Sequence, residues 1–170
     1  MGRTVSRAVF GTVVFTFLVP CTVAGVVPYF LVTGSQLFTF RSALTQISGV
    51  VLFASGVLIY AWCAYDFATF GRGTPSPTHP PQELVVRGLY RFSRNPMYVG
   101  VSSVVFGEAL FFGSGNQLVY ACCVLAGFHA RVITGEEQAL RRVFGASYEA
   151  YCSRVPRWIG FVKKGERHED

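Results

Sequence analysis

Charged residues are scarce in this sequence. They make up 14% of its 170 residues, whereas soluble globular domains carry about 25%. Hydrophobic residues reach 51% and the mean hydropathy is +0.41. A chain of this length corresponds to one domain, and this composition excludes an ordinary soluble one. We therefore predict an all-α integral membrane protein whose residues 1–170 form a single domain.

Cysteine patterns that bind metal or build disulfide frameworks are also missing. The five cysteines form no C-x-x-C pair and no zinc-type spacing: Cys21, Cys63, Cys122, Cys123 and Cys152. Four of them lie in apolar runs, where a free cysteine behaves as a small hydrophobic residue. The sequence therefore predicts no metal site and no disulfide framework.

Four apolar runs are present, each bounded by polar residues. The first, Ala8 to Val32, and the second, Ala43 to Phe70, both exceed the roughly 20 residues that cross a bilayer core. The third and fourth, residues 97–112 and 117–133, lie near or below the lower limit for spanning. Only the short turn 113–116 separates them. We expect four transmembrane helices, of which the last two form a short antiparallel hairpin.

A polar loop, residues 71–96, divides the two pairs of apolar runs. Its first part, Gly71 to Pro81, holds four prolines and two glycines and cannot be helical. The Gly71-Arg72-Gly73 sequence fits either an approach of the backbone to an anionic group or a plain linker. The sequence leaves both interpretations open.

The C-terminal segment, residues 135–170, has an amphipathic pattern. Leu140, Phe144, Tyr148 and Tyr151 follow one another at intervals of four, four and three, which is one face of a helix. Gly145 interrupts this pattern at a cost of about 1 kcal/mol relative to alanine. We expect a C-terminal amphipathic helix on the cytoplasmic side of the membrane.

The positive charges indicate the topology. The 15 Lys and Arg outnumber the 9 Asp and Glu, giving a net charge of +6. In a membrane protein such an excess reports orientation, and we expect no nucleic-acid partner. Apart from Arg41, the basic residues precede the first run, lie in the middle loop, or follow or close the fourth run. Four crossings with both termini and the middle loop in the cytoplasm satisfy the positive-inside rule.

The predicted parts are two N-terminal transmembrane helices (1–70), a cytoplasmic loop (71–96), a helical hairpin (97–134) and a C-terminal cytoplasmic segment (135–170).

Two polar clusters meet in this topology. Residues 94–100 begin the third run and Glu136-Glu137 close the fourth, so a tight hairpin brings both to the same cytoplasmic level. Polar groups near hydrocarbon need partners, and neighbouring carboxylates repel unless a cation or hydrogen-bond donor separates them. Either a ligand or Arg–Glu pairing satisfies these groups. Asp66, Glu108 and His129 are further polar residues in apolar surroundings, each interpretable as an interfacial or a cavity residue.

The chain resembles a known family in its C-terminal half. The residues that carry the resemblance are Gly88-x-Tyr90-Arg91-x-x-Arg94-Asn95-Pro96-x-Tyr98-x-Gly100 and then Glu136-Glu137-x-x-Leu140-x-x-x-Phe144-Gly145-x-x-Tyr148-x-x-Tyr151-x-x-x-Val155-Pro156-Arg157-Trp158. This pattern looks like the signature of the isoprenylcysteine carboxyl methyltransferase family and its relatives, the membrane phospholipid N-methyltransferases. It covers about Gly71 to Trp158, and the first two helices carry no family signal.

The resemblance implies methyl transfer from S-adenosylmethionine to a lipophilic acceptor at the membrane surface. The cofactor would lie between the last two helices and the C-terminal segment, against these residues: Arg94, Asn95, Pro96, Tyr98, Gly100, Glu136, Glu137, Tyr148, Tyr151 and Arg157. The familiar form of the motif has histidine where this chain has Asn95, and asparagine cannot titrate near pH 7.

The implied roles are those of binding and positioning. Glu136 or Glu137 would accept hydrogen bonds from the ribose or the ammonium, and Arg94 or Arg157 would pair with the methionine carboxylate. Three tyrosines would wall the adenine: Tyr98, Tyr148 and Tyr151. Methyl transfer is an in-line displacement, for which positioning supplies about 7 to 11 kcal/mol. No catalytic nucleophile is needed, and Arg94, Asn95 and Tyr98 are the positioning residues.

Three alternatives stay open. The acceptor can be an isoprenylcysteine carboxylate, a phospholipid or a small thiol. A membrane reductase of related architecture would instead bind NADPH, whose 2'-phosphate requires basic side chains such as Arg87, Arg91, Arg141 and Arg142. In a non-catalytic membrane module the arginines and glutamates would pair only with one another.

Overall fold

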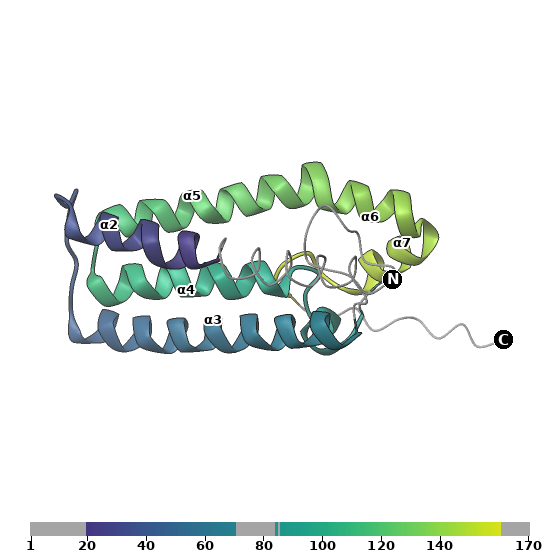
Figure 1. Ribbon diagram of the computed structural model, residues 1–170, viewed down its shortest axis with the longest axis horizontal. Helices are drawn as coiled ribbons and strands as arrows, with labels where there is room; N and C mark the ends of the chain where they lie inside the picture. Colours follow the sequence, from purple (N-terminus) through teal and green to yellow (C-terminus); the bar gives the residue numbers. More distant parts are fainter. Residues whose placement is uncertain (1–19, 71–83, 85, 161–170) are drawn as a thin grey trace, which may run out of the picture.

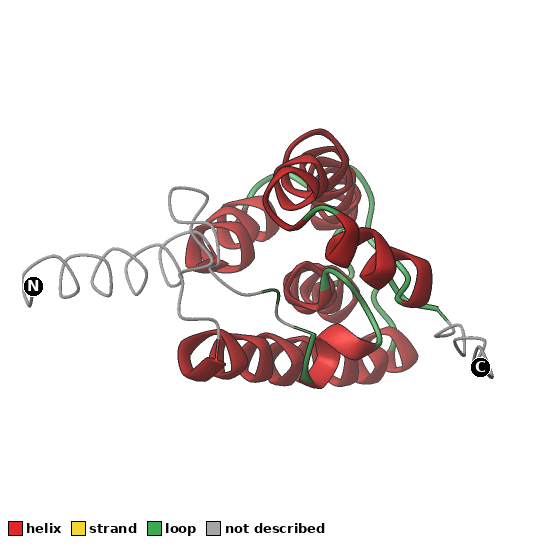
Figure 2. Ribbon diagram, turned by 90° about the vertical axis from the view of Figure 1, so that its right-hand side faces the viewer, coloured by secondary structure: helices red, strands yellow, loops and turns green. Residues whose placement is uncertain are grey.

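The computed structural model describes residues 20–70, 84 and 86–160, and these residues form helices and loops without a strand (Figures 1 and 2). The elements in chain order are η1 (Thr22–Val26), α2 (Val27–Thr33), α3 (Ala43–Phe70), η2 (Gly88–Arg91), α4 (Pro96–Phe112), α5 (Gly115–Arg131), η3 (Val132–Glu136), α6 (Glu137–Phe144) and α7 (Ala146–Arg154).

The long helices are antiparallel to their neighbours in the chain. Figure 1 shows α3, α4 and α5 along the longest axis, with α4 between the other two. The α2 helix packs on α4 and α5 at the end where the α4–α5 turn lies, and α6 and α7 lie at the opposite end. The N-terminal residues of α4 and the C-terminal residues of α5 therefore meet at one end of the bundle.

Glycines bring α3 and α4 into backbone contact. Gly49 and Gly56 of α3 face Gly107 and Gly100 of α4. A Cβ at Gly56 would lie 2.6 Å from the Gly100 carbonyl oxygen, and one at Gly49 would lie 2.7 Å from the Gly107 oxygen. Small residues allow such approach between membrane helices, where packing replaces the hydrophobic effect as the driving force.

Two described helical stretches are long and apolar enough to cross a membrane: Ala43–Asp66 and Gly115–Phe144. Only 17% and 11% of their most apolar windows are buried within the protein, unlike the core helix of a soluble protein. Large apolar side chains such as Leu44 and Leu58 are exposed. A lipid environment accounts for such faces, since soluble proteins rarely expose large contiguous apolar patches.

The sequence predicts the α3 range and the α4–α5 turn correctly. The predicted second run has the same bounds as α3, Ala43–Phe70. Gly113 ends α4 with a positive φ of 63°, which glycine adopts without strain, and Ser114 caps α5 by accepting a hydrogen bond from the Gln117 amide. Residues 8–19 of the first predicted run and the Gly71–Pro81 loop lie outside the described residues, so the number of crossings stays a prediction.

The predicted end of the fourth helix is wrong. The α5 helix continues through the π-helix η3 into α6, so the helical stretch extends to Phe144 and does not end near Gly135. The break falls at Gly145, whose φ of 50° and ψ of −125° divide the predicted amphipathic helix into α6 and α7. Glycine inside a helix costs only about 1 kcal/mol, which explains how Gly135 stays helical.

Candidate functional site

The start of α4 is bound to the C-terminal segment through backbone atoms. Pro96 occupies the first turn of α4, where its missing N–H costs nothing. The Asn95 side chain caps no helix amide; its Nδ2 donates to the Arg157 carbonyl oxygen at 3.0 Å. The Arg94 amide donates to the Pro156 oxygen at 2.9 Å. These bonds place Arg94 and Arg157 side by side.

Glu137 is the centre of a buried ion cluster. Arg157 donates to it twice, from Nε to Oε1 at 2.6 Å and from Nη2 to Oε2 at 3.0 Å. Arg94 Nη1 lies 3.0 Å from Oε1, and Arg141 Nη2 lies 3.7 Å from Oε2. Glu137 is only 2% exposed, and a charge so buried needs partners of this kind. We call Arg94, Glu137, Arg141 and Arg157 the buried cluster after Glu137 and Arg94, whose side chains are 3% and 11% exposed; those of Arg157 and Arg141 are 33% and 44% exposed.

The electrostatics of Glu137 follow from these contacts. Burial by itself would raise the pKa of its carboxyl group. The Arg157 hydrogen bond and the charges of Arg94, Arg157 and Arg141 outweigh that effect, and the pKa of Glu137 is lowered. The carboxylate is therefore charged at neutral pH.

Glu136 belongs to a different and more exposed group. The Tyr98 hydroxyl donates to its Oε1, and Arg131 Nε donates to the same oxygen at 3.0 Å and to the Tyr98 hydroxyl at 3.1 Å. The Glu136 side chain is 36% exposed and that of Arg131 47%. We call Tyr98, Arg131 and Glu136 the exposed cluster.

The π-helix η3 explains the Arg131–Glu136 pair. In a regular α-helix, residues five apart point to different sides, because neighbours on one face lie three or four apart. A π-turn bonds residue i to i+5, and η3, Val132–Glu136, begins directly after Arg131 and ends at Glu136. Arg131 entered the sequence-based prediction only as one of the basic residues that close the fourth run, and its pairing with Glu136 was not predicted.

Tyr148 and Tyr151 lie in the apolar core beneath the clusters. They pack with Val155 and are 2% and 6% exposed. The Tyr151 hydroxyl donates to the Tyr90 carbonyl oxygen at 2.6 Å. Burial raises the pKa of Tyr148 to about 12, so its hydroxyl is neutral. Both predicted adenine-wall tyrosines are therefore buried in the protein core.

The charged residues of the predicted site and Tyr98 fall into the exposed cluster or the buried cluster, and Gly100 falls into neither. The structure brings Tyr98 together with Glu136, and Arg94 together with Glu137 and Arg157. Gly100 instead faces Gly56 at the α3–α4 contact, away from both clusters. Among the described residues, no three His, Cys, Asp or Glu side chains gather as metal ligands would.

His129, whose role the sequence leaves open, contacts Trp158, a residue of the family motif. The Trp158 indole Nε1 donates to His129 Nδ1 at 3.1 Å, and the two rings stack with centroids 5.9 Å apart. The centroids of the Tyr98 ring in α4 and the Phe128 ring in α5 lie 4.5 Å apart. The Phe128 ring therefore flanks Tyr98 of the exposed cluster. Asp66, also left open, is buried against the Gly88 backbone.

Comparisons with known proteins agree on one kind of relative. A family model described as "Phospholipid methyltransferase" matches residues 44–147. The chain is 35% identical over 79 residues to a protein-S-isoprenylcysteine O-methyltransferase of Schizosaccharomyces pombe, a match that covers 46% of this chain and 34% of that protein. It is 31% identical over 80 residues to protein-S-isoprenylcysteine O-methyltransferase B of Arabidopsis thaliana, covering 47% and 41%.

A third relative is a probable protein-S-isoprenylcysteine O-methyltransferase of Oryza sativa subsp. indica, 31% identical over 81 residues, with 48% and 42% covered. The matches thus span less than half the length of these curated relatives. No solved structure matches at a significant level.

Proposed function

The chain belongs to the phospholipid methyltransferase family, and from that premise we propose that it transfers a methyl group from S-adenosylmethionine to a lipophilic acceptor at a membrane surface. The observation that carries this proposal is the position of the exposed cluster. It lies where α4 begins and α5 ends, beside the buried cluster and at the end of an apolar helix bundle. A polar cofactor can reach that end from water, and an apolar acceptor can reach it from lipid.

The hydrogen-bonding groups of the two clusters fit S-adenosylmethionine. Tyr98 and Arg131 both donate to Oε1 of Glu136. Its second oxygen, Oε2, accepts no bond from the described residues and suits ribose hydroxyls or an ammonium. The Nε of Arg94 is buried and has no hydrogen-bond partner within the described ranges, which suits a carboxylate. The bound cofactor would supply an activated methyl group on a sulfonium. The residues around it would hold donor and acceptor in line.

The buried cluster has a positioning role in this proposal. Glu137 engages Arg157 through two hydrogen bonds and Arg94 through one ion pair, so it joins the C-terminal segment to the start of α4. Rigid placement of this kind lets Arg94 and Tyr98 meet a ligand without reorganisation. Tyr148 and Tyr151 would form the floor of the pocket, and Asn95 holds the Arg157 backbone as a neutral donor.

The first acceptor class to test is an isoprenylated cysteine carboxylate, because that is the reaction named for the relatives. A phospholipid amine is the second, from the description of the family. NADPH is the competing cofactor, and of the four basic residues named for its 2'-phosphate, Arg141 already contacts Glu137 and Glu149. We further propose that residues 1–170 act as one domain with both termini and the site on the cytoplasmic face. A reporter fused after Asp170 tests this orientation in intact cells.

The deciding experiment measures binding to the full chain in lipid nanodiscs. We expect S-adenosylhomocysteine to bind and NADPH not to bind. A labelled-methyl assay on membrane extracts then identifies the species that gains the methyl group. Binding of NADPH without S-adenosylhomocysteine would refute methyl transfer, and binding of neither would favour a non-catalytic module.

A further inference from the structure

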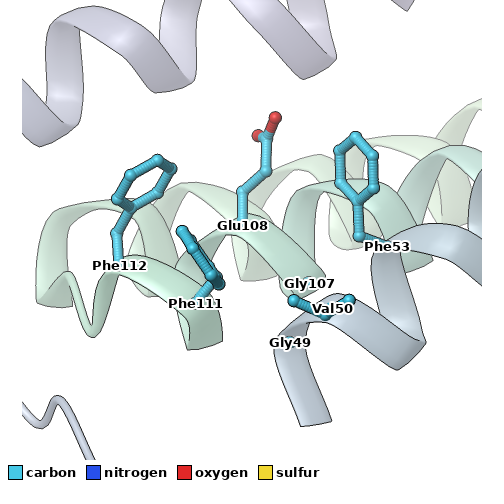
Figure 3. A pocket seen from close by; sticks show the side chains of 7 residues that line it. All are labelled: Gly49, Val50, Phe53, Gly107, Glu108, Phe111 and Phe112. Carbon is cyan, nitrogen blue, oxygen red and sulfur yellow. The ribbon is translucent and has the colours of Figure 1, made fainter. Parts of the chain in front are cut away.

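A second polar feature lies at the other end of the bundle. A cavity of about 360 Å³ opens between α3 and α4 near the α4–α5 turn (Figure 3). Its lining is apolar except for one side chain: Gly49, Val50, Phe53, Gly107, Glu108, Phe111 and Phe112. Figure 3 shows the Glu108 carboxyl group standing between the rings of Phe53 and Phe112.

Glu108 differs from the other described glutamates. Glu136, Glu137 and Glu149 each pair with an arginine. Glu108 Oε2 is buried and has no hydrogen-bond partner in the part of the chain that the structure describes. Tyr120, a phenol that interacts with Glu108 electrostatically, donates its hydrogen to the Val23 carbonyl oxygen instead. A polar group buried without a partner costs free energy, so this carboxyl group calls for a donor.

The cavity opens onto the exposed apolar surface of the helices. Three lining residues are exposed on the apolar surface: Val50, Phe53 and Phe112. Phe112 is the last residue of α4, and Glu108 lies four residues before it, about 6 Å along the helix axis. A molecule at the membrane interface can therefore bring a polar head to Glu108 and keep an apolar body against the phenyl rings.

We propose that this cavity binds the ammonium group of a lipophilic amine, with Glu108 as its counterion. An ammonium ion supplies both the opposite charge and the hydrogen bonds that a carboxylate accepts, and such bonds are roughly twice as strong as neutral ones. Glu108 lies ten residues along α4 from Tyr98, about 15 Å. The site is therefore separate from the proposed methyl-transfer site and does not depend on it.

Binding of labelled decylamine to the full chain in phosphatidylcholine nanodiscs tests the proposal. We expect saturable binding of one molecule per chain above that of empty nanodiscs, with decanol a poor competitor. Glu108→Gln keeps the shape of the side chain and should weaken binding about tenfold or more, equivalent to ~1.4 kcal/mol. Val50→Phe, which narrows the lipid-facing opening, should also weaken it.

Glu149→Gln is the matched control, because it removes an exposed carboxylate at the other end of the molecule; decylamine affinity should not change. Far-ultraviolet circular dichroism verifies that each variant keeps its helices. No saturable binding to the wild type, or equal binding to Glu108→Gln, would overturn the proposal.

A second arm identifies the source of the amine. The nanodiscs are prepared with phosphatidylethanolamine in place of part of the phosphatidylcholine. Displacement of decylamine would assign the site to a phospholipid ammonium group, and undiminished binding would assign it to a free lipophilic amine. Either result must depend on Glu108. If phosphatidylethanolamine reduces decylamine binding equally in the wild type and in Glu108→Gln, the result counts against the site.

Discussion

Arg157 and Glu137, twenty positions apart, form a two-point ion pair, with Nε–Oε1 and Nη2–Oε2 distances of 2.6 and 3.0 Å. The pair joins the segment after α7 to the first residue of α6. Arginine matches a carboxylate in this way because its guanidinium is a planar fork of donors. The contact places Arg94 beside the same carboxylate.

Removal of the Glu137 charge should destabilise the protein. In Glu137→Gln, the largely buried Arg94 and the one-third-exposed Arg157 lose their counterion, and a charged hydrogen bond of this kind contributes roughly 1.5 to 3 kcal/mol. Denaturant unfolding of the purified protein measures the loss. Glu149→Gln breaks the exposed pair with Arg141 and should cost less than about 1 kcal/mol. Equal losses for the two variants would contradict a special role for Glu137.

The same pair predicts a pH dependence. The pKa of Glu137, which lies in α6 beyond the apolar part of the helix, is lowered in the folded state. Its contribution to stability is therefore complete above the unfolded pKa of glutamate, about 4.3, and is lost as the pH falls through the lower folded value. Unfolding measured between neutral and acidic pH should show this loss in the wild type. The Glu137→Gln variant, which lacks the titrating group, should show a smaller slope.

The exposed cluster should contribute to cofactor affinity more than to folding. In the proposed site, Glu136→Gln removes the charge that would meet an ammonium or ribose, and Tyr98→Phe removes the hydroxyl that orients Glu136. Each should weaken S-adenosylhomocysteine binding about tenfold, since a charged hydrogen bond contributes roughly 1.5 to 3 kcal/mol. Isothermal titration of the nanodisc-bound protein measures this, with Glu149→Gln as control. Unchanged affinity in both variants would exclude the exposed cluster from the site.

The α3–α4 contact should tolerate no side chain at Gly56. The new Cβ of Gly56→Ala would lie 2.6 Å from the Gly100 oxygen and 2.8 Å from the Val104 amide nitrogen, so the helices must separate at a cost of about 1 to 3 kcal/mol. Gly127→Ala is the control, because nothing lies within 4 Å of that position and alanine favours helix by about 1 kcal/mol. Unfolding in mixed micelles should therefore show opposite signs for the two variants.

Local patterns were sufficient for the helices and the turn between α4 and α5. The bounds of α3 follow from an uninterrupted apolar run, and the turn follows from Gly113 and Ser114. Local patterns did not predict where the fourth helix ends. Gly135 and Gly145 are both glycines, and only the conformation of the chain shows that Gly145 breaks the helix while Gly135 stays inside it. The Leu140, Phe144, Tyr148 and Tyr151 set does gather in one core cluster, although two helices supply it.

The sequence by itself determined the apolar helices, the family motifs and the proximity of residues 94–100 to Glu136 and Glu137. These depend on composition and short spacings, which act along the chain. Tertiary structure alone decided that Glu137 is buried among arginines while Glu136 stays exposed with Tyr98, and that Glu108 stands in a cavity. The physical reason is that a carboxylate's environment depends on partners distant in sequence: Arg157 lies twenty residues from Glu137, and the wall that faces Glu108 comes from α3.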